Sequence, residues 1–170
     1  MTVLTNVSKV DLSILLWCTK SHYYQRFISF VRAVSKTGDG YMQVLLPVAI
    51  TVISGFEQIA FLVLVAKAYL IERPLYFVLK NTLKRRRPPE VEPSVKSIVT
   101  PSDQFSFPSG HTMAAFLLAS LATIEFGAIA SILYLWASMV GASRVILSVH
   151  FPTDILAGAA IGTGLAIILV

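Results

Sequence analysis

The sequence predicts an all-α fold: a multi-pass transmembrane helical bundle of five or six spans, in a single domain of residues 1–170. Composition is the first observation, because 55% of the residues are hydrophobic, 14% are charged and mean hydropathy is +0.73. Ordinary soluble domains are less apolar. The second is a set of four apolar stretches near the roughly 20 residues that a spanning helix needs. They cover residues 56–79, 109–125, 127–149 and 152–170.

The remaining segments are shorter or more polar. A fifth apolar stretch, residues 40–54, is shorter and contains Pro47. The N-terminal part, residues 1–36, is amphipathic or interfacial: basic and apolar residues alternate between 10 and 35, which predicts one or two amphipathic helices. These helices either supply a shortened sixth span or lie at the membrane interface. Residues 80–108, named here the site loop, are polar and rich in proline, which predicts a loop outside the bilayer.

Net charge and cysteine content limit the kinds of ligand and partner that are expected. The net charge of +5 suits anionic lipid headgroups or an anionic substrate, and no soluble basic face exists for nucleic acid, so no nucleic-acid partner is expected. Cys18 is the only cysteine, which excludes an internal disulfide and a thiolate metal cage. The N-terminal residues lack a signal-peptide pattern, so we expect insertion through the mature helices. The sequence leaves the oligomeric state open.

Alternating spans bring distant polar clusters together. The span of 56–79 ends, the span of 109–125 begins, the span of 127–149 ends and the span of 152–170 begins on one membrane face. This parity holds whether or not residues 10–35 cross the bilayer. Three polar clusters at these helix ends are therefore expected to be neighbours in space, with the active site on that face.

The first cluster contains Lys80 and Arg87, followed by Pro88. Their spacing of seven residues is about two helical turns, so both cations lie on one face if the helix continues, and both can hold one anion. The alternative is a basic run beside the membrane that contacts lipid phosphates or sets topology.

The second cluster is Pro108-Ser109-Gly110-His111 at the start of an apolar helix. Ser109 is a good N-cap, Gly110 lets a ligand approach the backbone, and the free amides of Ser109, Gly110 and His111 predict an anion site. His111 adds a group that exchanges a proton near neutral pH. The alternative is a capped helix start with an incidental interfacial histidine.

The third cluster contains Arg144, His150, Pro152 and Asp154. A helix that starts at Pro152 brings Asp154 beneath His150, where it accepts from one ring nitrogen and leaves the other free as a nucleophile. Arg144 is suited to bidentate binding of phosphoryl oxygens. The alternative is a satisfied polar cap. All three clusters are expected on one membrane face. This joint occurrence favours a phosphate-binding site over the alternatives in which the residues only cap helices or set the membrane topology.

Together these motifs resemble the type 2 phosphatidic acid phosphatase superfamily of membrane lipid phosphatases, which is related to vanadium haloperoxidases and bacterial acid phosphatases. The family pattern has three parts: Lys and, seven positions on, Arg-Pro; then Pro-Ser-Gly-His; then Ser-Arg, His and Asp. This chain matches every position, at Lys80, Arg87-Pro88, Pro108-Ser109-Gly110-His111, Ser143-Arg144, His150 and Asp154. Family members usually have six membrane helices, whereas five are clear here.

The resemblance implies a role for each matched residue. His150 attacks phosphorus and becomes a phosphohistidine while Asp154 orients it, and His111 protonates the leaving oxygen and then activates water. The three equatorial oxygens are held by Lys80, Arg87, Arg144 and the amides near Ser109 and Gly110. No metal or other cofactor is expected. This fits phosphoryl transfer, which depends on positioning and charge stabilisation.

The expected function is hydrolysis of a phosphate monoester or diphosphate of a membrane lipid. Undecaprenyl diphosphate, phosphatidylglycerophosphate, phosphatidic acid and lipid A 1-phosphate all remain open as substrates. Two alternatives stay open as well: a lipid phosphotransferase that uses the same phosphohistidine, and a non-catalytic protein that binds anionic lipid. The expected location is the bacterial inner membrane, with the site on the periplasmic or outer face as in the family's bacterial members, although a positive-inside count favours the cytoplasm.

Overall fold

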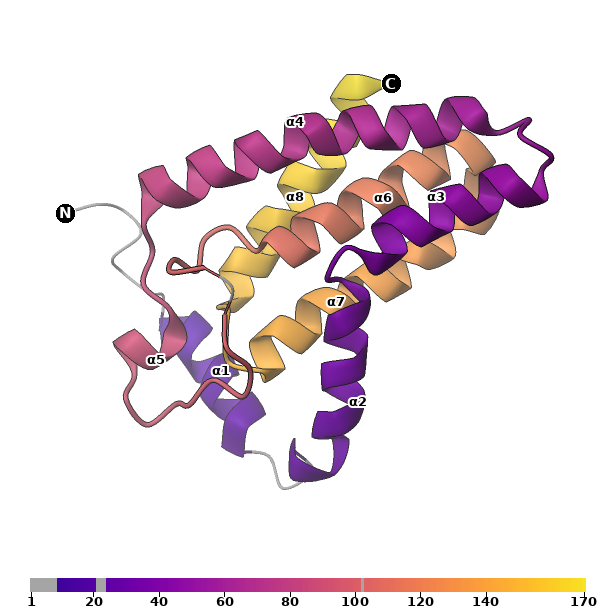
Figure 1. Cartoon of the computed structure of the whole chain (residues 1–170). Coiled ribbons are helices and arrows are strands. Elements are labelled where there is room, and N and C mark those ends of the chain that lie inside the picture. Colours follow the sequence, from indigo (N-terminus) through magenta and orange to yellow (C-terminus); the bar gives the residue numbers. More distant parts are fainter. Residues whose placement is uncertain (1–8, 21–23, 102) are drawn as a thin grey trace.

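The computed structural model describes residues 9–20, 24–101 and 103–170 and contains no β-strand in that part of the chain. The described residues form eight α-helices and one 3₁₀ helix (Figure 1). In chain order they are α1 (Lys9–Lys20), α2 (Tyr24–Thr37), α3 (Tyr41–Ile53), α4 (Ile59–Leu83), α5 (Pro88–Val91), α6 (Gly110–Phe126), the 3₁₀ helix Gly127–Ser131, α7 (Ile132–Ile146) and α8 (Pro152–Leu169). The all-α prediction is confirmed.

Five helices, α3, α4, α6, α7 and α8, run lengthwise beside one another with alternating direction (Figure 1). Helix α6 is at the centre and contacts the other four. Its sequence explains this position, because it is apolar around its whole circumference, and such helices are buried or span a membrane. The ends of α4 and α7 and the starts of α6 and α8 therefore lie at one end of the bundle, named here the site end.

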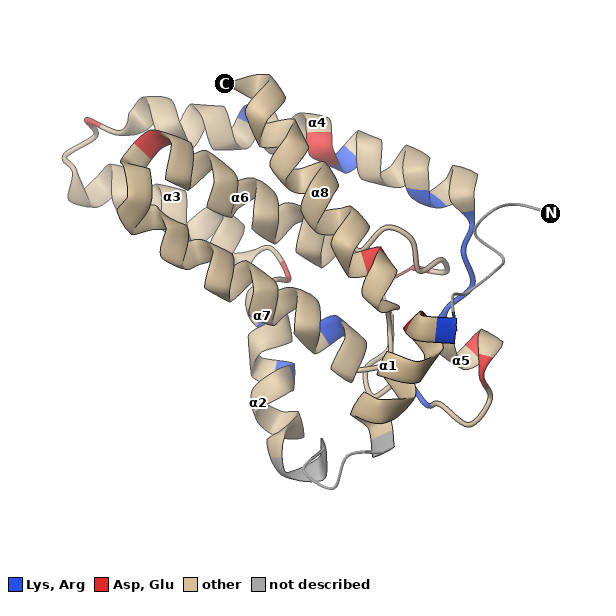
Figure 2. Ribbon diagram, turned by 180° about the vertical axis from the view of Figure 1, so that it is seen from behind, with Lys and Arg blue, Asp and Glu red and all other residues tan. Residues whose placement is uncertain are grey.

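The N-terminal part forms two helices, in agreement with the prediction of one or two helices over residues 10–35. Helix α2 packs against α7, and α1 contacts α7 and α8 near the site end. Most of the basic residues also gather at this end, around α1, α5 and the end of α4 (Figure 2). Residues 1–8 and 21–23, which include His22, lie outside the described residues.

By length and composition, two helical stretches of the described chain are suited to cross a membrane: Gly110–Ile146, which contains α6 and α7, and Pro152–Leu169. Helix α3 is apolar but has 13 residues. Helix α4 has 25 residues and includes Lys67, Glu72 and Arg73. A bundle with five or six crossings stays a prediction.

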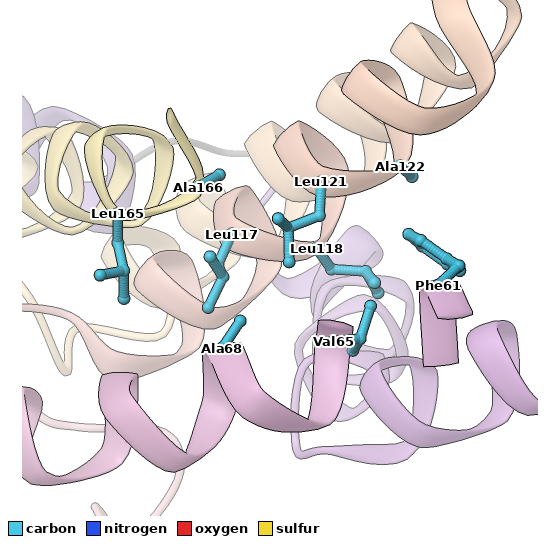
Figure 3. Packing of buried hydrophobic residues seen from close by; sticks show 9 residues of the cluster. All are labelled: Phe61, Val65, Ala68, Leu117, Leu118, Leu121, Ala122, Leu165 and Ala166. Atoms are coloured by element: carbon cyan, nitrogen blue, oxygen red, sulfur yellow. The ribbon is translucent and has the colours of Figure 1, made fainter. Parts of the chain in front are cut away.

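The core between α4, α6 and α8 is made of aliphatic side chains and one aromatic ring (Figure 3). It contains Phe61, Val65, Ala68, Leu117, Leu118, Leu121, Ala122, Leu165 and Ala166. The Phe61 ring meets Phe126 edge to face, with ring centroids 4.9 Å apart. In a lipid environment such contacts act through close packing, since lipid tails are as apolar as the side chains. This core fixes α4 against α6 and so positions the site end.

Two glycines let α8 approach α6 closely. A Cβ atom on Gly162 would lie 2.2 Å from the carbonyl oxygen of Met113, and one on Gly158 would lie 2.6 Å from that of Ser109. The α6 backbone occupies the space that a side chain would need, so these positions require glycine.

We expect Gly162→Ala to lower the free energy of unfolding by about 1–3 kcal/mol, because α8 has to move away from α6. Gly164→Ala is the matched control, since a Cβ atom there would have nothing within 4 Å. Thermal unfolding of both variants in detergent measures the difference. Equal melting temperatures for the two variants would show that the approach of α8 to α6 does not limit stability.

Candidate active site

Three backbone contacts bring the predicted motifs together at the site end. Arg87 donates from its guanidinium to the carbonyl oxygen of Val149 at 2.5 Å, which joins the first motif to the third. Nδ1 of His150 lies 2.6 Å from the carbonyl oxygen of Ser106, just before the second motif. The amide of Ser109 donates to the carbonyl oxygen of Asp154 at 3.1 Å. The prediction that the three clusters are neighbours is confirmed.

Lys80 and Arg87 converge on Asp103 of the site loop. The Lys80 Nζ atom lies 2.7 Å from Asp103 Oδ1, and the Arg87 guanidinium binds the same carboxylate, as does the hydroxyl of Tyr76. Both cationic side chains are buried. Burial opposes ionisation of Asp103, but the hydrogen bonds from Lys80 and Tyr76 and the charge of Arg87 lower its pKa below the ordinary value. In this structure an anion therefore already occupies the point where the two cations meet.

The route to this convergence differs from the prediction. Helix α4 ends at Leu83, and Lys84 adopts a left-handed conformation with φ 47°. A shared helical face for Lys80 and Arg87 was expected only if the helix continued, and this condition is not met, because Arg87 follows the end of the helix. The site loop also begins later than expected and contains the short helix α5.

Ser109 occupies the N-cap position of α6, as predicted, but its groups are committed to the protein. Its hydroxyl lies 2.9 Å from that of Thr112, and its amide is bound by Asp154. The expectation of a free Ser109 amide was wrong for this reason. Amides of Gly110 and His111 have no acceptor among the described residues. They remain available at a helix N-terminus, where anions bind.

Gly110 is required by packing. A Cβ atom at this position would lie 2.7 Å from the ring of Tyr76. The sequence suggested that glycine admits a ligand to the backbone; the structure adds that Tyr76 of α4 rests against the start of α6. This contact places Tyr76 beside both the basic cluster and the helix start.

His111 contacts a residue that the sequence analysis did not single out. Its Nε2 atom lies 2.5 Å from Oδ1 of Asp39, in the turn between α2 and α3. The side chains of His111 and Asp39 are 21% and 42% exposed, so both are reachable from solvent. Asp39 is the acidic residue of the turn sequence Gly38-Asp39-Gly40. Its position in a glycine turn was visible, but no spacing related it to His111.

His150 is held by a backbone carbonyl. A carbonyl oxygen only accepts hydrogen bonds, so the 2.6 Å contact with Ser106 places the proton of neutral His150 on Nδ1 and leaves the lone pair on Nε2. Burial is the largest effect on this imidazole and lowers its pKa to about 4. A neutral imidazole with a free Nε2 lone pair is a nucleophile.

Asp154 lies near His150 but is engaged elsewhere. Its Oδ2 atom is 3.6 Å from Nδ1 of His150, beyond hydrogen-bond distance, and accepts from the amide of Phe151 at 2.8 Å. Its Oδ1 atom accepts from Arg85 at 2.5 Å. The helix start at Pro152 that was predicted to bring Asp154 beneath His150 is confirmed. The direct acceptor for His150 is Ser106, and that part of the expectation was incomplete.

Arg85 links Asp154 to the N-terminal helix. Its guanidinium lies 2.7 Å from Oδ2 of Asp11 in α1, and Asp11 also accepts from the amide and hydroxyl of Thr153. Arg85 also lies over the ring of Phe151, 4.5 Å from its centroid. Asp11 and Arg85 were not predicted as parts of the site, because their roles depend on how α1 folds back on α8.

Arg144 faces the centre of the site end. One guanidinium nitrogen donates to Ser35 Oγ of α2 at 2.6 Å, and Nε is buried without a hydrogen-bond partner in the described part of the chain. A buried donor without a partner is costly, and an anionic ligand satisfies it. This supports the predicted role of Arg144 in binding phosphoryl oxygens.

A pocket of about 960 Å³ opens at this end of the bundle and is lined by residues of α2, α3, α4, α6, α7, the turn after α2 and the site loop. They include Asp39, Gln43, Tyr69, Arg73, Tyr76, Asp103, Gly110, His111 and Arg144. This volume is typical of sites for lipid headgroups and other small molecules. His150 is not among the lining residues, and its side chain is 3% exposed. Side chains around it have to move before a phosphate reaches Nε2.

The described residues contain no group of three His, Cys, Asp or Glu side chains arranged to hold a metal ion. The polar groups that converge at the site end are mainly cationic, and cations in a site favour phosphate over a metal ion.

Comparisons with known proteins agree with this geometry. A family model described as the PAP2 superfamily matches residues 57–170. The lipid A 1-phosphatase of Porphyromonas gingivalis is 43% identical over 63 residues, which make up 34% of this chain and 14% of that protein. The chain therefore spans only a small part of this curated relative.

Two solved structures are similar over nearly the whole chain. LpxE from Aquifex aeolicus has a TM-score of 0.80 and 28% sequence identity, and the match covers 99% of this chain and 98% of that one. A transmembrane PAP2-type phosphatidylglycerolphosphate phosphatase from Bacillus subtilis has a TM-score of 0.72 and 22% identity, with coverage of 97% and 87%. The second likeness shows the fold alone. All three motifs lie within the matched region, and the chain belongs to the PAP2 superfamily.

Proposed function

We propose that this protein is a membrane lipid phosphatase that hydrolyses a phosphate monoester or diphosphate of a lipid through a phosphohistidine at His150. One observation carries the proposal. The Ser106 carbonyl holds the Nδ1 proton of His150 and leaves its Nε2 lone pair free, at an end of the bundle where Nε of Arg144 has no hydrogen-bond partner among the described residues. A neutral nucleophile beside cations suits attack on a phosphate.

In the first half of the reaction, the Nε2 lone pair of His150 forms a bond to phosphorus as the bond between phosphorus and the lipid oxygen breaks. His111 gives a proton to that oxygen, and the lipid leaves as an alcohol, or as a monophosphate if the substrate is a diphosphate. Arg144 and the amides of Gly110 and His111 stabilise charge on the equatorial oxygens. Lys80 and Arg87 contribute once Asp103 releases its contacts with them.

In the second half, His111 takes a proton from water, and the water oxygen bonds to phosphorus as the bond between phosphorus and Nε2 breaks. Inorganic phosphate leaves and His150 returns to its neutral form. The negatively charged equatorial oxygens are held by the same cations throughout. No step requires a metal ion.

The bundle is proposed to lie in the bacterial inner membrane with its site end on the periplasmic or outer face. Alternation of the five long helices supports one common face for the motifs. The amphipathic helix α2 and the charged helix α1 fit the interface at that end. Lipids then reach the pocket from the surrounding leaflet.

A lipid A 1-phosphate is the first candidate substrate, because the curated relative is a lipid A 1-phosphatase. The structural likeness to Aquifex aeolicus LpxE supports the same family of reactions. The other three candidates are phosphatidylglycerophosphate, phosphatidic acid and undecaprenyl diphosphate. They share a phosphate on an apolar anchor and differ in the group next to the phosphate.

Phosphate release from these four lipids by the detergent-purified protein, with EDTA present, tests the proposal. We expect release from at least one lipid by the wild type and none by His150→Ala. Transfer of the phosphoryl group to an added lipid or sugar acceptor without release would make the protein a phosphotransferase. Binding of the lipids with neither release nor transfer would leave a non-catalytic lipid-binding protein.

The protonation state of His150 gives a pH prediction. Burial holds its pKa near 4, below the ordinary value of 6.5, so the imidazole stays neutral at neutral pH and becomes protonated only as the pH falls through about 4. Protonation occupies the Nε2 lone pair, so phosphorylation of His150 is lost over that same range. Imidazole ¹⁵N resonances, assigned with His150→Gln, should show a proton on Nδ1 alone down to about pH 5. A midpoint at or above 6.5, or a proton on Nε2, would contradict the assignment.

A further inference from the structure

We infer that Asp39 is a positioning residue for His111: it holds the Nε2 proton, so that Nδ1 is the atom that exchanges a proton with the leaving oxygen and then with water. This inference rests on the proposed function, in which His111 is the general acid. Asp39 lies outside residues 57–170, to which the family model matches, and therefore outside the region that carries the motifs.

The contact is direct and has a defined orientation. Oδ1 of Asp39 lies 2.5 Å from Nε2 of His111. A Cβ atom on the neighbouring Gly38 would lie 3.4 Å from Cδ2 of His111, the carbon bonded to Nε2. The Nε2 edge of the ring therefore faces the turn between α2 and α3. Nδ1 lies on the opposite side of the ring and has no hydrogen-bond partner among the described residues. This nitrogen is therefore free to contact the substrate.

The turn that carries Asp39 is fixed to the rest of the molecule. The amides of Gly38 and Asp39 donate to the carbonyl oxygens of Ser35 and Lys36, each at 3.0 Å. Gln43 of α3 donates to the carbonyl oxygen of Gly38 at 3.2 Å.

Two further contacts tie the end of α2 to α7. Trp136 Nε1 donates to Thr37 Oγ1 at 2.9 Å, and Arg144 donates to Ser35 Oγ at 2.6 Å. Gly38 is required here, since a Cβ atom would lie 2.7 Å from Val140. The carboxylate is thus held in place before substrate binds, as a positioning group requires.

The charges around His111 explain why the carboxylate of Asp39 is needed beside it. Burial is the largest effect that opposes a positive charge on the imidazole, and Arg144 of α7 and Arg73 of α4 oppose it as well, whereas Asp39 favours it. General acid catalysis needs that positive charge, because the imidazolium is the form that carries protons on both nitrogens.

Nδ1 of His111 supplies the proton that the leaving oxygen needs. In the imidazolium, the Nε2 proton stays in the hydrogen bond to Asp39. The bond between Nδ1 and its proton breaks, and the proton bonds to the lipid oxygen that leaves phosphorus. Neutral His111 then has its lone pair on Nδ1, ready to take a proton from water in the second half. Asp39 keeps this tautomer throughout, as carboxylates that orient a catalytic imidazole do.

Substrates with different leaving groups separate this role from a structural one. A lipid phosphate has an alkoxide leaving group that needs the proton, whereas p-nitrophenyl phosphate has a phenolate that leaves without one. On the lipid we expect Asp39→Asn to lower kcat by about 10–100-fold, the range typical for removal of a residue that orients a metal-bound histidine. With p-nitrophenyl phosphate we expect the burst rate of p-nitrophenolate release, which reports phosphorylation of His150 alone, to change by less than about threefold, because general acid catalysis contributes little to that step.

Two variants complete the design, all in the purified full chain. Asp39→Glu keeps the carboxylate and should recover part of the lost kcat on the lipid. Glu57→Gln is the matched control: Glu57 is an exposed acid in the turn after α3, and it should behave as wild type with both substrates. The ¹⁵N resonances of His111 should also show the Nε2 proton in wild type.

Three results would overturn the inference while the proposed function stands. They are an unchanged or raised kcat of Asp39→Asn on the lipid, an equal loss in kcat on the lipid and in the burst rate with p-nitrophenyl phosphate, and a proton on Nδ1 alone in neutral wild-type His111. A wild type that hydrolyses neither substrate would instead overturn the proposed function, and the inference with it.

Discussion

His150→Ala should lower lipid phosphate hydrolysis by at least about 10⁴-fold, because it removes the nucleophile and leaves only the surrounding charges to act. The effect should be the same for every lipid that the wild type hydrolyses, since the attacking atom does not depend on the leaving group. The loss should appear in kcat and not in KM, because Arg144 and the helix start of α6 still bind the phosphate. Phosphate release at saturating substrate measures it.

Arg86→Ala is the control for this variant. Arg86 lies in the site loop near the other cations, but its side chain is exposed and makes no hydrogen bond or ion pair with the described residues; only its backbone carbonyl accepts from Ser106. It should keep close to wild-type activity. His150→Ala with more than about 1% of wild-type kcat, in a protein that melts at the wild-type temperature, would remove His150 from the role of nucleophile.

Arg85→Ala should have the largest effect on stability. Arg85 is buried and binds Asp11 of α1 at 2.7 Å and Asp154 of α8 at 2.5 Å. Its removal leaves two buried carboxylates without their shared cation, and breaking a buried ion pair in this way costs about 3–5 kcal/mol. The melting temperature in detergent should fall by at least about 6 °C.

Two comparisons make the Arg85 prediction specific. Arg86→Ala removes the adjacent exposed guanidinium and should melt within about 1 °C of wild type, because exposed charges contribute little. Arg85→Lys should recover only part of the loss, since an ammonium does not present the planar fork that reaches Asp11, Thr153 and Asp154 together. Equal melting temperatures for the Arg85 and Arg86 variants would show that this network does not stabilise the fold.

Helix positions and their parity were predictable because they depend on local properties. Apolar length fixes where α6, α7 and α8 run, and Pro152 and the Ser109 N-cap mark two helix starts. Alternating direction then brings the motifs to one end without any knowledge of the loops. For this reason the neighbourhood of His111, Arg144 and His150 followed from the sequence.

The partners of these residues did not follow from the sequence. Asp11, Asp39 and Asp103 reach the site from α1, the turn after α2 and the site loop, and their positions depend on how those segments fold back. The acceptor for His150 is the backbone carbonyl of Ser106. Every residue has a backbone carbonyl, so the residue type gives no indication of this contact.

The role of Arg85 could not be predicted from the sequence either. Arg85 stands in a basic run, and its guanidinium binds two carboxylates of the protein, Asp11 and Asp154. Both carboxylates are distant from Arg85 in the sequence, so no local pattern relates them to it.

Trapping the phosphorylated protein tests the central claim most directly. His111→Ala should still be phosphorylated by p-nitrophenyl phosphate, because this leaving group needs no proton, but should hydrolyse the intermediate slowly for want of a base. We predict an acid-labile, base-stable phosphoryl group on His150 in this variant, found by mass spectrometry after a rapid quench in base. The adduct should be absent from the double variant His111→Ala, His150→Ala. Turnover by wild type with no adduct in the His111 variant, or an adduct on a residue other than His150, would contradict the account.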